Sequence, residues 1–220
     1  KFIIFHYTGM KNERDAINKL TNQNSKVSSH YFIKRNGEIL TLIPDLYIAW
    51  HAGISRWKNY NSLNRFSIGI EISNPGHDYK YNKFSKKQIK SILELSYFLI
   101  KKYKIKPKFI LGHSDISPDR KKDPGEKFPW KYLSQKKIGF WHTLRERKLK
   151  KLRNQKILRL EENAFIKNLY EIGYSKNLLK KNNQYKKILT TAFQRHFRPK
   201  LINGIIDKEC FELSKNLLKI

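Results

Sequence analysis

The chain has 220 residues, enough for one domain of ordinary size and a smaller one. With 39% hydrophobic and 13% aromatic residues it cannot be mainly disordered, and no apolar run approaches the roughly 18 to 20 residues that a membrane-spanning helix needs. Its single cysteine, Cys210, excludes an intramolecular disulfide framework and a CxxC metal site.

The formal net charge of +29 is spread over the chain rather than gathered in a basic tail. A large positive charge favours a polyanionic partner, because lysine and arginine release counterions when they meet phosphates. Abundant lysine, isoleucine and asparagine are also typical of an A/T-rich coding sequence, so mutational bias is an equal explanation. The chain has no helix-turn-helix, zinc-finger or RNA-binding signature, and we expect no nucleic-acid partner.

The first half of the chain predicts a β-sheet. Phe2 to Phe5 is a continuous apolar run, typical of a strand that is covered on both faces, and His6 stands at its end. Two further strand patterns, residues 31–34 and 38–43, flank Asn36-Gly37, and this dipeptide is the strongest signal for a two-residue hairpin. Residues 67–73 alternate isoleucine with small residues and Glu71, which leaves an open strand face around a carboxylate.

A long amphipathic helix follows, because Ser85 and Gln88 form a capping box and apolar residues then recur at helical spacing until Lys106-Pro107. Residues 109–111 predict a further strand that ends next to His113. Residues 117–129, with three prolines and one glycine, predict an ordered loop. We expect an α/β fold, with a central mixed β-sheet flanked by helices.

The last third of the chain is helix-prone. A basic stretch, residues 144–160, predicts a connecting helix, and three short helices that can bury one small core follow over residues 163–172, 184–197 and 207–218. We therefore expect a main α/β domain over residues 1–142, a connecting helix or linker over 143–160 and a small three-helix C-terminal domain over 161–220.

Two histidines and one aspartate predict a metal site. His6 and His113 both stand at strand ends, and Asp123 lies in a loop that its prolines stiffen, so the three side chains can return to one point. Three nitrogen and oxygen ligands with an open fourth position describe a catalytic zinc site rather than a structural one.

The chain resembles the zinc-dependent N-acetylmuramoyl-L-alanine amidases of the AmpD/AmiD type, whose fold is shared by peptidoglycan recognition proteins. The resemblance extends over residues 3 to 142 and depends on the order and spacing of several motifs. These are His6-Tyr7-Thr8, Val27 to Tyr31, Ala49-Trp50-His51-Ala52-Gly53, Leu63-Asn64 with Ser67 to Glu71, Gly112 to Gly125, Phe128-Pro129-Trp130, Gly139 and Trp141.

The resemblance implies that His6, His113 and Asp123 bind Zn²⁺, that Glu71 is the general base or acid, and that Lys121 stabilises the oxyanion. It implies hydrolysis of the amide bond between N-acetylmuramic acid, or its 1,6-anhydro form, and L-alanine. The partner would then be peptidoglycan or a muropeptide, and we expect a monomer.

Five further residues are candidates for substrate binding: His30, Trp50, His51 and Asn64, which lie in these motifs, and Trp57. The two histidines among them more often orient a neighbour or line a groove than bind zinc, and the two tryptophans either stack on sugar rings or pack. The remaining histidines, His77, His142 and His196, are interpreted as surface or packing residues.

The C-terminal segment resembles the peptidoglycan-binding domain, a three-helix module, chiefly through Phe193-Gln194-Arg195-His196-Phe197-Arg198-Pro199. Such a module would anchor the enzyme to its polymeric substrate. Two other function classes stay open: a peptidoglycan-binding protein without activity, and a nucleic-acid binder. We expect the protein to be located in the bacterial envelope, in the periplasm in particular, with outer-membrane attachment through a removed N-terminal segment. The alternative location is the cytoplasm.

Overall fold

The structure is a computed structural model that describes residues 1–177 and 184–220. Its centre is a five-stranded mixed sheet in the order β3-β2-β6-β1-β7. The strands β1, β6 and β7 are parallel, β2 is parallel to β6, and β3 pairs with β2 in the predicted antiparallel hairpin. The strands of this sheet are β1 (Phe2–Tyr7), β2 (Tyr31–Ile33), β3 (Ile39–Thr41), β6 (Ser67–Ile72) and β7 (Ile110–Gly112).

Eight α-helices, three short 3-10 helices (Gln23–Ser25, Leu63–Arg65 and Pro107–Phe109) and a small hairpin complete the described part of the chain. The hairpin pairs β4 (Arg56–Trp57) with β5 (Tyr60–Asn61). The helices are α1 (Glu13–Thr21), α2 (Lys86–Tyr103), α3 (His113–Ile116), α4 (Trp130–Gln135), α5 (Glu146–Leu152), α6 (Arg159–Ile172), α7 (Tyr185–Phe197) and α8 (Lys208–Leu218). No helix among the described residues is long and apolar enough to cross a membrane.

Helix α2 covers one face of the sheet. Its capping box forms as predicted, since the Ser85 hydroxyl accepts from the Gln88 N–H and the Gln88 side chain accepts from the Ser85 N–H. The buried face of α2 packs against alternate strand residues, among them Ile3, Phe5 and Ile70. This core fixes the orientation of the sheet, so the side chains on the other face are free to build a site.

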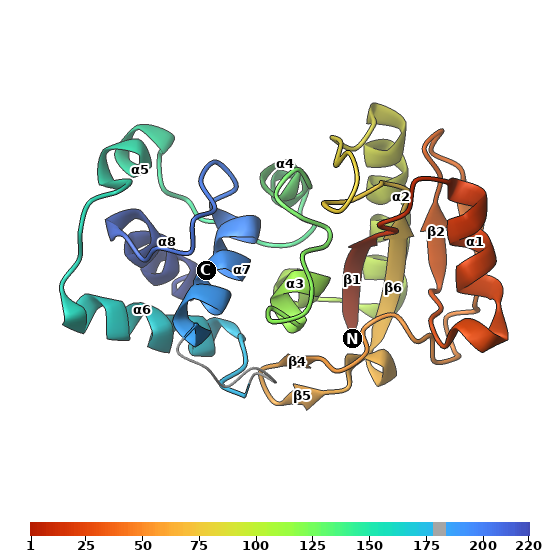
Figure 1. Cartoon of the computed structure of the whole chain (residues 1–220), viewed down its shortest axis with the longest axis horizontal. Coiled ribbons are helices and arrows are strands. Elements are labelled where there is room, and N and C mark those ends of the chain that lie inside the picture. Colours follow the sequence, from red (N-terminus) through yellow and green to blue (C-terminus); the bar gives the residue numbers. More distant parts are fainter. Residues whose placement is uncertain (178–183) are drawn as a thin grey trace.

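The other face of the sheet packs against the C-terminal helices. Phe2, Ile4 and Leu111 belong to one buried apolar cluster with Phe165 of α6 and Phe193 of α7. Figure 1 shows α5 to α8 gathered on one side of the molecule and the sheet on the other, with α3 and α4 between them. The three-helix arrangement is as predicted, but its core continues into the central sheet.

The continuous helix predicted over residues 144–160 is wrong, because α5 ends at Leu152 and α6 begins only at Arg159. The intervening chain is held by α8 instead. Arg153 donates from Nε to Glu209 Oε2 at 2.7 Å, and the Asn154 N–H donates to Asp207 Oδ2 at 3.0 Å. Asn154 adopts a left-handed conformation, with φ of 62°, that no continuing helix allows. These tertiary bonds outweigh the local helix propensity of the stretch.

Candidate metal centre

Three buried side chains bring their donor atoms together at the carboxyl end of β1. His6 Nδ1 lies 2.9 Å from His113 Nδ1 and 3.0 Å from Asp123 Oδ2, and the last two atoms are 3.1 Å apart. His6 comes from β1, His113 begins α3 directly after β7, and Asp123 comes from the loop that follows. The Ser114 N–H donates to the Asp123 carbonyl at 2.8 Å, which ties this loop to α3.

The hydrogen bonds around the two histidines fix which ring nitrogen carries a proton. His113 Nε2 lies 3.1 Å from the Ala52 carbonyl, which can only accept, so Nε2 is protonated and Nδ1 offers a lone pair. The Ala52 N–H in turn donates to Asn64 Oδ1 at 2.7 Å. Asn64 therefore holds the loop that orients His113. It was predicted as a substrate contact, but it does not line the groove beside Glu71 that is described below.

A chain of three groups fixes His6 in the same way. The Ser67 hydroxyl donates to the Leu63 carbonyl at 2.6 Å, so at 3.2 Å it accepts the proton of His51 Nε2. His51 Nδ1 is then an acceptor, and it takes the Nε2 proton of His6 at 2.9 Å. His6 Nδ1 is thereby left with a lone pair that faces the other two donor atoms. Such outer partners orient metal ligands in many proteins.

Gly69 makes room for this chain. A Cβ at Gly69 would lie 2.3 Å from Cγ of the His51 ring, far inside van der Waals contact. The small residues that alternate with isoleucine along β6 therefore let the His51 ring lie directly on the strand. The open strand face that was predicted for residues 67–73 thus gives the His51 ring room to lie against Gly69.

The donor set fits a zinc ion. Ligand atoms about 2.0 to 2.1 Å from zinc at tetrahedral angles lie roughly 3.3 Å apart, close to the separations found here. Two imidazole lone pairs and a carboxylate that face one another in a buried site repel unless a cation lies between them. His6, His113 and Asp123 are the group among the described residues whose donor atoms converge in this way.

The charge state of His6 also suits a metal. Burial and the neighbouring His113 lower the pKa of His6 to about 4, so its imidazole is neutral at pH 7. His6 is thus in the protonation state that metal binding requires.

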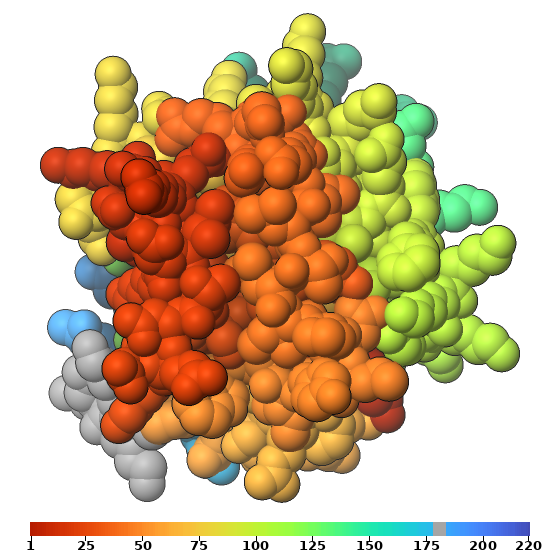
Figure 2. All heavy atoms as spheres, turned by 90° about the vertical axis from the view of Figure 1, so that its right-hand side faces the viewer, coloured from red at the N-terminus to blue at the C-terminus, as the bar shows by residue number. Residues whose placement is uncertain are grey.

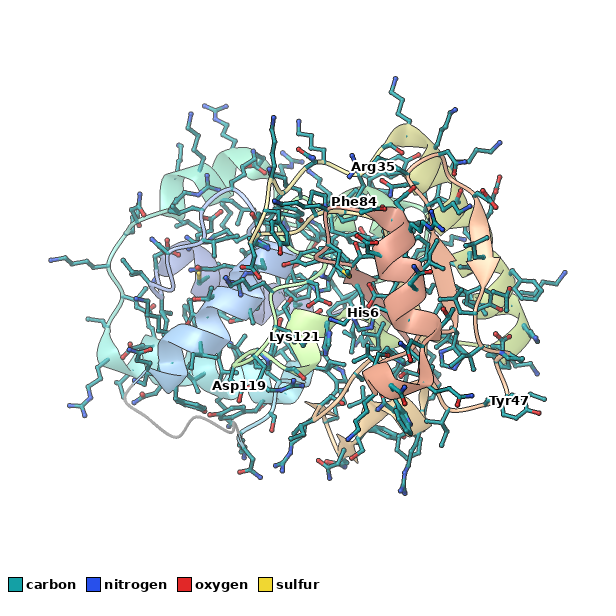
Figure 3. All side chains as sticks on the ribbon, turned by 45° about the vertical axis from the view of Figure 1, so that its right-hand side comes forward. His6, Arg35, Tyr47, Phe84, Asp119 and Lys121 are labelled. Atoms are coloured by element: carbon teal, nitrogen blue, oxygen red, sulfur yellow. The ribbon has the colours of Figure 1, made fainter. Side chains whose placement is uncertain are left out.

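Glu71 lies beside the metal centre as the register partner of His6 on β6. Burial and the negative charge of Asp123 raise the pKa of Glu71 to about 8, while the cation of Lys121 opposes this rise. Glu71 Oε2 is buried and has no hydrogen-bond partner among the described residues. Figure 3 shows His6 near Lys121, which lies on the loop after α3.

A groove leads to these residues. Its inner part, about 130 Å³, is lined by Glu71, His113, His51 and Trp50, together with α1 residues such as Lys19. An outer part of about 470 Å³ shares Trp50 with the inner part and lies between α1 and the segment after β3. These two segments, red and orange in Figure 2, lie side by side on that face of the molecule. Trp50 is 54% exposed, as a substrate contact must be.

Besides Asn64, two more of the predicted substrate contacts lie away from the groove. Trp57 is fully buried and packs edge-on against Tyr174 at 5.0 Å, so its packing interpretation holds and its role as a sugar platform is wrong. His30 is also buried: its Nδ1 accepts the Gly69 N–H at 3.0 Å and its Nε2 donates to the Tyr47 carbonyl at 3.1 Å. It orients neighbouring backbone and does not line the groove.

The remaining histidines lie outside the metal centre. His77 bonds to Tyr7 and Glu126, and His142 lines a separate cavity of about 690 Å³ between α4, α5 and the end of α7. His196 is buried against α3.

Sequence reasoning missed α1, whose Lys19 and Leu20 line the groove. Asn12, which caps α1 by accepting the Arg14 N–H, was the available signal.

Comparisons with known proteins show the family of the chain. Residues 1–126 match the family model described as Amidase_2, N-acetylmuramoyl-L-alanine amidase. The N-acetylmuramoyl-L-alanine amidase AmiD of Escherichia coli is 33% identical over 231 residues, which cover all of this chain and 82% of AmiD. The 1,6-anhydro-N-acetylmuramyl-L-alanine amidase AmpD of Haemophilus influenzae is 41% identical over 114 residues, 51% of this chain and 60% of AmpD.

Solved structures of two amidase relatives match the fold of this chain over almost its whole length. The E. coli AmiD complex with anhydro-N-acetylmuramic acid-L-Ala-D-gamma-Glu-L-Lys superposes with a TM-score of 0.88 at 32% identity and covers 100% of this chain and 88% of AmiD. AmpDh3 of Pseudomonas aeruginosa superposes with a TM-score of 0.87 at 29% identity, over 99% of this chain and 91% of AmpDh3. With its family model, its full-length relative and its fold in agreement, the chain belongs to the N-acetylmuramoyl-L-alanine amidase family.

Proposed function

We propose that the chain is a zinc-dependent hydrolase that cleaves the amide bond between N-acetylmuramic acid, or its 1,6-anhydro form, and L-alanine in peptidoglycan or its fragments. The observation that carries this proposal is the convergence of three buried donor atoms beside a carboxylate at the end of a groove. The AmiD relative was solved with a substrate that contains this bond.

The proposed chemistry divides among few residues. His6, His113 and Asp123 would hold zinc, which when bound acts as a Lewis acid and activates water at neutral pH. A carboxylate with a pKa near 8 can take a proton from the attacking water and return it to the departing L-alanine nitrogen, and Glu71 meets this requirement. The Lys121 ammonium would stabilise the oxyanion of the tetrahedral intermediate.

The groove suggests how the substrate lies. We place the scissile amide in the inner part, because Glu71 and His113 line it. The outer part would accommodate the rest of the substrate, with the exposed Trp50 ring as a platform for a sugar or the stem peptide. The C-terminal helices would contact the polymer, and we expect the protein to act in the cell envelope during cell-wall turnover and recycling.

The test is digestion of anhydro-muropeptides and of intact sacculi by the full chain, followed by mass spectrometry of the products. We expect peptides with a free L-alanine amino group, and we expect a chelator to abolish their release and zinc to restore it. Binding of sacculi without release of peptide at any zinc concentration would instead identify a recognition protein without activity. Release that is unaffected by the chelator would contradict the zinc assignment.

A further inference from the structure

A buried carboxylate joins the metal-binding segment to the C-terminal helices. Asp115, on α3, is 1% exposed. Its Oδ1 accepts from the Tyr174 hydroxyl at 2.8 Å, and its Oδ2 accepts from His196 Nδ1, also at 2.8 Å. Tyr174 follows the end of α6 and His196 lies on α7, so both donors come from the C-terminal region and both reach one side chain of the catalytic region.

Asp115 is placed to fix the position of His113. The two residues share the single turn of α3, and Asp115 Oδ2 also accepts the Gly112 N–H at 2.8 Å. The carboxylate thus holds the backbone at the point where β7 ends and the His113 residue begins the helix. A helix of four residues has few bonds of its own, so its position depends on such external contacts.

His196 is held in one orientation by its neighbours. Its ring stacks on Trp130 at 3.9 Å and 17° and on Phe197 at 3.9 Å and 8°. Because Asp115 accepts the Gly112 N–H with the same oxygen, His196 Nδ1 must be the donor in the bond between them. The indole of Trp130 on α4 therefore also contributes to aiming the imidazole at Asp115.

The energetic importance of these donors follows from burial. A carboxylate that is out of water needs hydrogen bonds, and loss of one donor to a charged buried group costs more than loss of a bond between neutral groups. If Tyr174 or His196 could not donate, α3 would have to move until Asp115 found water or another donor. His113 would move with it, away from His6 and Asp123.

We propose that Tyr174 and His196 are positioning residues for the metal site: through Asp115 they hold His113 in place, so zinc affinity depends on the C-terminal helices. This inference rests on the proposed zinc site. It extends the role of the C-terminal region from attachment to polymer toward assembly of the active site itself.

The test measures zinc affinity of full-length variants by competition with a chromogenic chelator. Tyr174→Phe removes one hydroxyl and no volume, and His196→Leu removes the second donor. Each should raise the zinc dissociation constant roughly three- to tenfold, somewhat less than the 10- to 100-fold typical of a direct partner of a ligand. The visible absorption bands of the cobalt-substituted protein should shift in both variants, because the geometry around His113 changes.

Two further variants separate positioning from general stability. His196→Asn loses the stacking but keeps an N–H donor near the position of Nδ1. It should therefore bind zinc more tightly than His196→Leu and nearly as tightly as the wild type. Leu213→Ala removes a buried side chain of α8 from the apolar cluster of the C-terminal helices and leaves Asp115, Tyr174 and His196 unchanged. It should lower the melting temperature while the cobalt spectrum stays unchanged.

The outcomes are distinct. If Tyr174→Phe and His196→Leu bind zinc and cobalt like the wild type, or if Leu213→Ala weakens zinc binding equally, the positioning role is wrong. Failure of the proposed function would look different, because the wild-type chain would then bind no zinc that depends on His6.

Discussion

His6 and Glu71 are register partners on the parallel strands β1 and β6. Register partners project from the same face of a sheet, so a candidate metal ligand and the proposed proton carrier stand next to each other on two central strands. His113, Asp123 and Lys121 instead come from the segment after β7. One half of the site is thus built into the sheet, and a change confined to the Glu71 carboxylate should leave the position of His6 unaltered.

Glu71→Gln should abolish proton transfer while the fold and the zinc content persist. Groups that move protons contribute about 10²- to 10⁴-fold, and we expect kcat to fall within that range. Peptide release and elemental analysis measure the two effects, with Glu94→Gln on the exposed face of α2 as the control. Near-normal turnover would mean that another residue carries the proton, and loss of zinc would make Glu71 a ligand or a structural group.

Lys121→Ala should lower kcat by about 10²- to 10³-fold if the ammonium stabilises the oxyanion. The neighbouring Lys122 is a matched control, because its side chain is 53% exposed and pairs only loosely with Asp78, at 3.9 Å. Lys122→Ala should keep wild-type kinetics. Equal losses in the two variants would point to a diffuse effect of positive charge and would remove Lys121 from the mechanism.

The stability of the metal-free protein should depend on pH through Glu71. Burial and Asp123 raise the pKa of this carboxyl in the folded state to about 8, so the folded chain binds the proton more tightly than the unfolded chain. Its contribution to stability is full at acid pH and is lost as the pH rises through about 8.

Metal-free Glu71→Gln should therefore be more stable than the metal-free wild type at pH 9, by about 1 to 3 kcal/mol after allowance for the intermediate exposure of the residue as a whole. The difference should shrink toward pH 4. Urea unfolding in the presence of a chelator measures it across this range. A difference that does not change with pH would show that burial does not govern the Glu71 proton.

The chain from Ser67 through His51 to His6 should control metal affinity. His51→Phe keeps a ring but removes the acceptor that fixes the His6 tautomer, and we expect zinc to bind about 10- to 100-fold more weakly. Ser67→Ala should have a smaller effect of the same sign. Ser96→Ala is the control: this buried hydroxyl on α2 has no hydrogen-bond partner among the described residues, and its loss should not affect zinc.

The elements that sequence reasoning found are those with local signals. The Asn36-Gly37 hairpin, the Ser85 capping box and the apolar strand before His6 each depend on residues that are close in the sequence. The convergence of His6, His113 and Asp123 was also accessible, because parallel strands that end at one edge bring their following residues together.

The elements that sequence reasoning missed depend on distant partners. Trp57 is a core residue because Tyr174 packs against it, and the two are 117 positions apart in the sequence. The connection after Leu152 is irregular because Asp207 and Glu209 bind its backbone and its arginine. Nothing within a window of ten or fifteen residues records such contacts. Pattern alone therefore left Trp57 open between a sugar platform and a packing residue, and it assigned a continuous helix to the connection.

Phe2 and Leu111 share one buried apolar cluster with Phe165 and Phe193, so we expect the sheet and the C-terminal helices to unfold as one cooperative unit. Scanning calorimetry should show a single transition whose van't Hoff and calorimetric enthalpies agree. Proteolysis in the connection between α5 and α6 should yield no fragment that survives alone, because either half would expose an apolar face to water. A shorter chain without the C-terminal helices would need polar residues on the face of the sheet that these helices now cover.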